Sequence, residues 1–277
     1  MIGLSFSVRS VRVIARNTVR EAVRQRVLLF ISLLALALVL GAQWLREFNF
    51  GASEIRFITD FGFGAMAFFG AALSIVATSQ LFFSELDQRT VLTLLAKPVG
   101  RAEFLVGKYV GVAVITGLFC ATLTMALTAV LLLRDSTLFH RTVPALPSSD
   151  SVNVFALCIA GFAQWLKLLV LSIFTLLVAS FARSQLLATG VGFVLLVCGH
   201  LQFILQNTAD RGGGGVMRVA AFLVSRLVPD FQLFDLSELA GDAAGQWMQL
   251  VRLTSYAMIY VLAGAVVAVA VFRRREL

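Results

Sequence analysis

Long stretches without a charged residue alternate along the chain with short segments that hold most of the charge. A helix needs about 20 apolar residues to cross the roughly 30 Å hydrocarbon layer of a membrane. Five stretches reach about this length, and a further span fits within the longer region 152–182. The pattern therefore predicts an all-α integral membrane protein with six transmembrane helices. The predicted spans are about 27–45, 61–84, 109–133, 166–182, 186–206 and 253–272.

The region 152–182 is ambiguous, because its 31 residues are too long for one upright span and too short for two. At a rise of 1.5 Å per residue they would form a helix of about 46 Å. Two spans here would place the basic carboxyl end opposite the basic amino end, against the positive-inside rule. We therefore expect Val152 to Trp165 to form an outer-surface or re-entrant helix that leads into the fourth span. Lys167 then lies near the outer boundary and snorkels, with a transport role as the alternative.

The distribution of charge predicts the orientation. With both termini in the cytoplasm, the inner segments hold 14 Lys and Arg residues against 8 in the outer segments, which carry 10 of the 15 acidic residues. The net charge of +8 could also indicate nucleic acid, but its position beside apolar stretches favours an anionic lipid leaflet and no nucleic-acid partner. We expect a multi-pass protein of a bacterial cell (inner) membrane. Six arginines within the first 26 residues do not fit a cleavable signal peptide.

Residues 1–26 predict an amphipathic interfacial helix in the cytoplasm, and residues 27–277 form the six-span domain. Five arginines, spaced three or four residues apart, share one helical face, and small apolar residues share the other. These arginines are Arg9, Arg12, Arg16, Arg20 and Arg24. They predict contact with membrane lipid, either as an anchor alone or as a docking surface for a partner. Thr18 and Glu21 fit a capping box, which predicts a helix break near Asn17.

The loop between the second and third predicted spans combines charged residues with leucines. Thr90 can cap a short helix there, and Pro98 ends it. The apolar face of this helix is formed by Val91, Leu94 and Leu95. A short helix held at both ends by membrane helices suits insertion into a groove on another protein. A helix that rests on the bilayer surface is the alternative.

Gly107 and Gly111 lie at the mouth of the third predicted span. Small residues at this four-residue spacing let the backbone of another helix approach closely. The spacing would therefore allow a close helix approach here, as would the small residues around Gly62, Gly64, Gly70 and Ala71.

The loop follows the pattern E-x-D-x-R-T-x-x-x-L-L-x-K-P-V-x-R, and G-K-x-x-G follows at the start of the next span. This pattern resembles the cytoplasmic loop of ABC-2 type ATP-binding-cassette permeases. Three further segments are similar to parts of that family: the arginine-rich helix, Pro229-Asp230-Phe231 with Phe234-Asp235, and the ending Phe272 to Leu277. The resemblance covers nearly the whole chain, and it points to the branch that includes the permease for maturation of the copper enzyme nitrous oxide reductase.

The resemblance implies a six-span half-transporter that couples ATP hydrolysis in a partner to transport, with export as the expected direction. The expected partners are two copies of a cytoplasmic ATP-binding-cassette ATPase and a second permease copy, in a homodimer or with a related permease. Carried over residue by residue, the ATPase-coupling positions are Glu85, Asp87, Arg89, Thr90, Val91, Leu94, Leu95, Pro98 and Arg101. The first four lie at the elbow before the coupling helix, and the last two lie at its exit. Gly100 stands where the family often has Ser, so a looser helix start is expected near Arg101.

The chain does not carry a phosphate-binding loop, because Gly107-Lys108 is followed by Tyr109 rather than by Ser or Thr. ATP and Mg are therefore expected in the partner subunit, with no cofactor in this chain. Cys198 and His200 are too few for a closed metal site. We expect a transport subunit and not an enzyme.

Composition and the placement of charge weigh against other classes. With 59% hydrophobic and 14% charged residues, the chain is neither an ordinary soluble domain nor disordered. An ion-coupled secondary transporter or an intramembrane enzyme would need polar groups at membrane depth, and the five clear spans contain no charged residue. A non-transporting anchor or regulator for a cytoplasmic ATPase would use the same loop, so this function remains an alternative.

Overall fold

The computed structural model of the protein describes residues 7–44, 54–87, 100–139, 153–210, 229–235 and 243–274. All regular elements among these residues are helical, so the all-α prediction is confirmed for them. The elements are α1 (Val8–Arg24), α2 (Arg26–Gly41), α3 (Glu54–Asp87), α5 (Arg101–Phe139), α6 (Val154–Phe181), α7 (Gln185–Asp210), the 3-10 helix η2 (Gln232–Phe234) and α9 (Ala243–Arg273).

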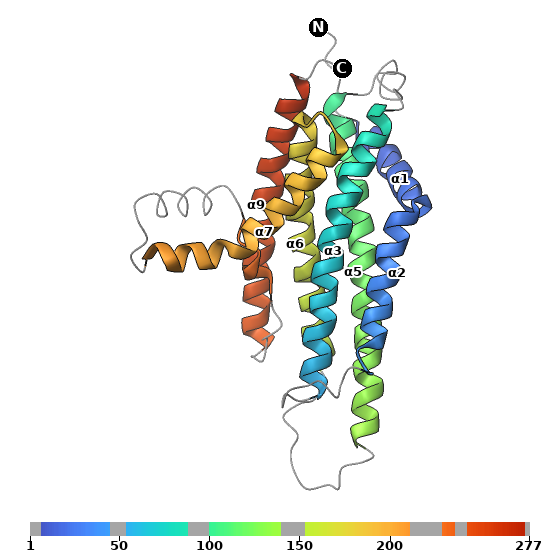
Figure 1. Ribbon diagram of the computed structural model, residues 1–277, viewed down its shortest axis with the longest axis vertical. Helices are drawn as coiled ribbons and strands as arrows, with labels where there is room; N and C mark the ends of the chain where they lie inside the picture. Colours follow the sequence, from blue (N-terminus) through green and yellow to red (C-terminus); the bar gives the residue numbers. More distant parts are fainter. Residues whose placement is uncertain are drawn as a thin grey trace.

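The long helices run side by side in an elongated bundle (Figure 1). The start of α1 and the end of α9 lie at the same end of this bundle, which we call the termini end; the opposite end is the far end. Helices α2, α5 and α7 run away from the termini end, and α3, α6 and α9 run toward it (Figure 1). In the described part of the chain, five helices are long and apolar enough to cross a membrane, or six if α1 and α2 together form one bent span.

Large apolar side chains on the outer faces of the bundle remain exposed, which is typical of contact with lipid rather than water. They come mainly from the helices that flank the centre. Examples are Phe30 and Leu33 of α2, Val194 and Val197 of α7, and Ile259 and Val266 of α9.

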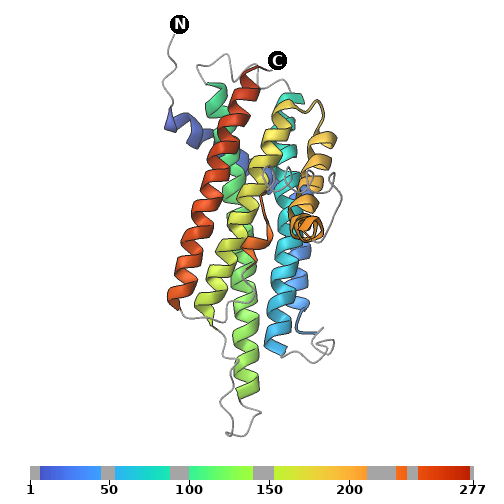
Figure 2. The same cartoon turned by 90° about the vertical axis from the view of Figure 1, so that its left-hand side faces the viewer.

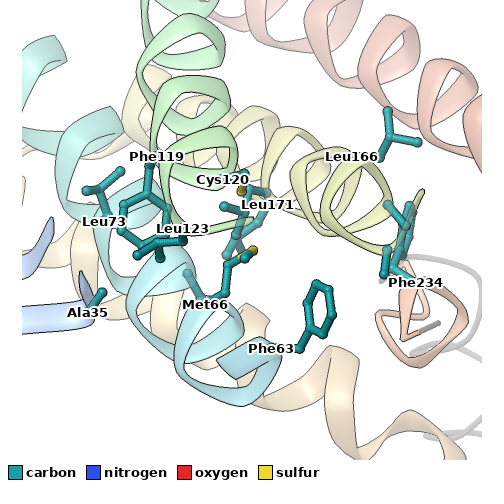
Figure 3. Packing of buried hydrophobic residues seen from close by; sticks show 14 of the residues in the cluster. Ala35, Phe63, Met66, Leu73, Phe119, Cys120, Leu123, Leu166, Leu171 and Phe234 are labelled. Carbon is teal, nitrogen blue, oxygen red and sulfur yellow. The ribbon is translucent and has the colours of Figure 1, made fainter. Parts of the chain in front are cut away.

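Helix α6 lies at the centre and contacts α3, α5, α7, α9 and η2. Large side chains of α6 and its neighbours fill the core. They include Leu73 of α3, Phe119 and Leu123 of α5, and Leu171 of α6 (Figure 3). Each of these four residues is at most 5% exposed. Close packing of this kind is the main source of helix association inside a bilayer, where lipid tails are as apolar as the core.

Hydrogen bonds between helices add to this packing. The Ser74 hydroxyl of α3 donates to the Leu168 carbonyl of α6 at 3.1 Å, and the Trp165 indole N–H of α6 donates to the Ala113 carbonyl of α5 at 3.0 Å. Polar side chains that bridge helices away from water fix the rotation of each helix about its axis.

The expected outer-surface or re-entrant helix at Val152 to Trp165 is wrong. Helix α6 is one continuous element of 28 residues, and the Asn153 side chain caps it by accepting a hydrogen bond from the Ala156 N–H at 3.2 Å. The segment Val154–Phe181 contains no proline, and nothing else in it ends a helix. At about 42 Å the helix exceeds the hydrocarbon thickness, so it tilts or extends beyond it.

The expected snorkelling of Lys167 is also wrong. Lys167 lies thirteen residues after Val154 and fourteen before Phe181, at the middle of α6, and it is 5% exposed. Snorkelling requires a side chain that reaches water at a helix end. Here the neighbouring helices cover the ammonium, which lies 3.0 Å from the His200 Nε2 of α7.

The expected break near Asn17 is wrong as well, because α1 is continuous from Val8 to Arg24. The Thr18 hydroxyl donates to the Ile14 carbonyl at 2.9 Å instead of capping a new helix. The bend comes later, at Gln25, where the backbone is extended and α1 and α2 meet at 70°. Figure 2 shows α1 turned away from the direction of the long helices.

Helix α1 packs directly on Gly107 and Gly111 of α5, so the close approach that this spacing allows is made here. A Cβ atom added at Gly107 would lie 2.8 Å from the Ile14 Cβ, and one at Gly111 would lie 2.6 Å from the Thr18 Cβ. The α1 carbonyls of Val11 and Ala15 would lie only 3.3 and 3.2 Å away. The backbones therefore approach to a distance that only glycine permits at these two positions.

The segment 229–235 packs against α7 at Gly199 and His200. Part of α7 turns sideways from the bundle (Figure 1). The Phe231 ring contacts Gly199, and the Gln232 side-chain N–H donates to the His200 carbonyl at 3.1 Å. This irregular segment is tolerated inside the bundle because protein groups satisfy its backbone.

We predict that Gly111→Ala lowers the free energy of unfolding by roughly 1–3 kcal/mol relative to Gly190→Ala, because the added methyl group clashes with Thr18. Gly190 is the matched control, since a Cβ there meets nothing within 4 Å. Both substitutions gain the same helix propensity, about 1 kcal/mol, so the difference isolates the clash. Thermal unfolding of the detergent-purified variants measures it, and equal stability of the two variants would contradict the contact.

Candidate functional site at the termini end

Most of the predicted ATPase-coupling residues lie outside the described residues, so their roles stay predictions. These are Arg89, Thr90, Val91, Leu94, Leu95 and Pro98. Glu85 and Asp87 belong to the last turn of α3, but their side chains also lie outside the described part. Arg101 is described, as the first residue of α5. The structure does describe the ends of α3 and α5, the two helices that flank the loop.

Three aromatic rings join the two ends of the loop to the end of α9. Phe82 of α3, Phe104 of α5 and Phe272 of α9 are all at most 4% exposed. The ring centroid of Phe272 lies 5.8 Å from that of Phe82 and 6.1 Å from that of Phe104. Such aromatic contacts add to the free energy of packing. The last turn of α9 is therefore held between the helices that precede and follow the loop.

Arg101 adds a polar contact to the same place. Its guanidinium donates from Nη1 to the Arg273 carbonyl at 2.9 Å. This carbonyl belongs to the last turn of α9, where backbone acceptors have no partner within the helix and the helix dipole favours a cation. The predicted exit residue of the coupling loop thus binds the end of the last helix.

Helix α5 begins at Arg101 with a well-defined cap, in contrast to the looser start expected from Gly100. The Phe104 N–H donates to the Gly100 carbonyl at 3.1 Å. The buried Glu103 carboxylate accepts hydrogen bonds from the Gly100 N–H at 3.4 Å and from the Ser7 N–H at 2.6 Å. Glu103 provides the side-chain half of a capping box, and it joins the start of α1 to the start of α5.

Glu21, Ser84 and Lys108 form a second polar contact among α1, α3 and α5, which we call the polar junction. The Ser84 hydroxyl donates to the Glu21 carboxylate at 2.6 Å, and the Lys108 ammonium donates to it at 3.5 Å. Lys108 is 2% exposed and the Glu21 side chain is 29% exposed. A buried ammonium is tolerated only with charged and hydrogen-bonding partners. The junction therefore couples the position of α1 to both flanks of the loop.

The five arginines of the amino-terminal helix are exposed, as a predicted membrane-surface stripe requires. The buried face is formed by Ile14, Ala15, Thr18 and Ala22. Beside it, a groove of about 590 Å³ runs between α1 and α5. Its walls are Val8, Val11, Ala15, Val19, Val110 and Val114, with Arg12, Arg16 and Arg20 along them. An apolar groove edged by cations matches the shape and charge of an anionic lipid.

Residues 12–276 match the family described as ABC-2 family transporter protein. The chain belongs to the ABC-2 transporter family. It is also similar to the "Probable ABC transporter permease protein NosY" of Stutzerimonas stutzeri, at 32% identity over 123 residues. This match covers 41% of the present chain and 45% of that protein. As a member of the ABC-2 transporter family, with five or six helices long and apolar enough to cross a membrane in its described part, the chain is a multi-pass membrane protein.

Sequence reasoning missed two of the carboxylates that hold this site together. Glu21 fitted a capping box, but its partners are Ser84 and Lys108, on helices far along the chain. Glu103 carried no assigned role, although its position three residues after Gly100 is a signal for a helix cap. A better signal for the junction was Lys108, a charge at the mouth of a span that must find a partner.

We predict that Glu21 and Lys108 are energetically coupled. In a double-mutant cycle of Glu21→Gln and Lys108→Met, the loss in unfolding free energy should be non-additive by roughly 0.5–3 kcal/mol, because the two charges share one contact. Thermal or denaturant unfolding in detergent measures each corner of the cycle.

The exposed ion pair of Arg56 and Asp60, at 3.9 Å, is the matched control. The cycle of Arg56→Gln and Asp60→Asn should give a coupling of about 0.5 kcal/mol or less. Additive effects of Glu21→Gln and Lys108→Met would show that the polar junction does not act as a unit.

Proposed function

We propose that this ABC-2 permease couples ATP hydrolysis in a separate cytoplasmic ATP-binding subunit to the export of a substrate. The observation that carries the proposal is the set of contacts that join the helices at the termini end. Both flanks of the predicted coupling loop are joined to α1 through Glu21 and to α9 through Phe272 and Arg101. Force applied to the loop would therefore move four helices together, and packed helices of this kind shift between discrete arrangements.

The proposed orientation places the termini end in the cytoplasm and the chain in the bacterial inner membrane. With α1 and α2 counted as an interfacial helix and a span, the chain crosses six times. The excess of basic residues in the segments at this end supports the orientation. The arginine stripe of α1 then faces the inner leaflet, where the groove beside Val110 and Val114 suits membrane lipid.

The proposed assembly contains two ATPase copies and two permease copies, as a homodimer or with a related permease. ATP and Mg bind to the ATPase, and this chain requires no cofactor of its own. The coupling helix of Val91 to Leu95 enters a groove on the ATPase, with Glu85, Asp87, Arg89 and Thr90 at its elbow. The exposed apolar faces of α2 and α9 are covered by lipid or by the second permease.

We predict that Arg89→Glu lowers the ATPase activity of the complete permease–ATPase complex roughly fivefold, which corresponds to about 1 kcal/mol of lost coupling. Reversing a charge at the elbow replaces an attraction at the docking surface with a repulsion. Arg252→Glu is the control, because this exposed residue lies toward the far end of α9. ATP hydrolysis by the purified complexes in lipid measures both variants. Unchanged activity in Arg89→Glu would count against the coupling role.

We predict that a cysteine at Thr93 reacts with a membrane-impermeant thiol reagent only after cells are permeabilised, since the loop is cytoplasmic in this proposal. A cysteine at Asn153, which is exposed at the far end, should react in intact cells. Both are placed in a background without Cys120, Cys158 and Cys198, the cysteines of the chain. Labelling of Thr93→Cys in intact cells would exclude an encounter with a cytoplasmic ATPase.

A further inference from the structure

A polar cavity of about 230 Å³ lies inside the bundle, away from the polar junction. It is enclosed by α3, α6 and the segment 229–235. Its polar lining consists of Arg56, Asp60, Gln164, Lys167 and Asp235. Phe63 and Phe234 line it from facing elements (Figure 3). A concave site with apolar walls and a few polar groups is the usual form of a small-ligand pocket.

Lys167 is the buried cation of this cavity. Among the described residues, no carboxylate oxygen lies within 4.0 Å of its ammonium. Its hydrogen-bond partner is His200 Nε2 at 3.0 Å. The His200 Nδ1 lies 2.9 Å from the Leu196 carbonyl, which can only accept, so Nδ1 carries the hydrogen and Nε2 accepts from Lys167. Two ammonium hydrogens of Lys167 remain for other acceptors.

Gln164 lies three residues before Lys167 and therefore on the same face of α6. It is 6% exposed, and its side-chain Nε2 has no hydrogen-bond partner within the described part of the chain. A buried amide without an acceptor is costly and rare in folded proteins. The inner wall of the cavity thus presents two kinds of N–H donor: the Gln164 amide, which has no acceptor within the described part of the chain, and the Lys167 ammonium, which has donors left beyond its bond to His200.

The mouth of the cavity differs from its inner wall. Arg56 and Asp60, both exposed, form an ion pair at 3.9 Å near the start of α3. The lining of α3 runs from Arg56 to Ala67, which is about 16 Å along the helix axis. Because α3 starts at the far end, the cavity extends from the far end toward the middle of α6.

We propose that this cavity binds a ligand through an oxyanion group, such as a phosphate, sulfate or carboxylate, which accepts hydrogen bonds from Gln164 Nε2 and Lys167 Nζ. The anion supplies the missing acceptor of the amide and a direct partner for the buried ammonium, on which Asp230 and Asp235 act only from beyond ion-pair distance. The group belongs either to a small free anion or to the headgroup of an anionic lipid, and the aromatic walls accept an apolar part in both cases. This inference does not depend on the coupling loop or on an ATPase.

The test uses the full chain without its ATPase, in nanodiscs of phosphatidylcholine. Inorganic sulfate is titrated at constant ionic strength against chloride, and thermal unfolding and calorimetry record binding. Saturable stabilisation by sulfate indicates a free anion. Stabilisation by phosphatidylglycerol in the nanodisc, with no response to sulfate, indicates a lipid headgroup. The absence of both responses overturns the proposal.

Three variants separate specific binding from the general effect of sulfate on protein stability. Gln164→Leu and Lys167→Met should each weaken binding about tenfold or more, because each removes a donor to a charged acceptor. Lys167→Gln, which keeps a donor without the charge, should lie between Lys167→Met and the native chain. Gln25→Leu, at the bend between α1 and α2, is the matched control and should bind as the native chain does. Equal binding in all variants overturns the proposal.

The unfolding temperature of the ligand-free protein gives an independent readout. Gln164→Leu should be as stable as the native chain or more stable, since it removes an unpartnered amide of similar volume. A lower unfolding temperature for ligand-free Gln164→Leu would mean that the amide already has a partner, and would contradict the vacancy on which the proposal stands.

Discussion

The arrangement of helices at the termini end depends on the close packing of α1 against Gly107 and Gly111 of α5. Glycine is required at both positions, because a Cβ atom at either would collide with α1. The close approach of α1 to α5 brings Glu21 within reach of Lys108 and Ser84. Without it, Lys108 would be a buried cation that had lost its partner on α1, which is destabilising. The glycine spacing and the polar junction are therefore two parts of one constraint, the first steric and the second electrostatic.

The polar junction and the cavity are connected by contiguous contacts. Tyr109, next to Lys108 on α5, donates its hydroxyl to the Leu169 carbonyl of α6 at 3.2 Å. Leu169 lies two residues after Lys167, which faces the cavity. Contacts of this kind are a physical route along which two sites can bias the same helix. Helix α6 is the element that both sites share.

The sequence predicted those features that depend on length, hydropathy and local spacing. The apolar stretches are helices because a bilayer admits few other structures, and the glycine spacing indicated that a close helix approach was possible without identifying α1 as the partner. Glu21 and Lys167 were misjudged because their surroundings are set by residues more than thirty positions away, such as Lys108 and His200. Periodicity cannot identify such partners. The spacing of Gln164 and Lys167 on an apolar helix was the available signal for the cavity.

The early end of α7 has a consequence for the surrounding lipid. Its upright part ends where the helix turns sideways from the bundle (Figure 1), whereas the neighbouring α6 is continuous for 28 residues, about 42 Å. Lipid chains beside α7 therefore meet a shorter apolar wall than lipid chains beside α6. Such hydrophobic mismatch is relieved by thinning of the membrane on that flank. The protein should consequently impose an asymmetric deformation on its bilayer, steepest where α7 turns sideways.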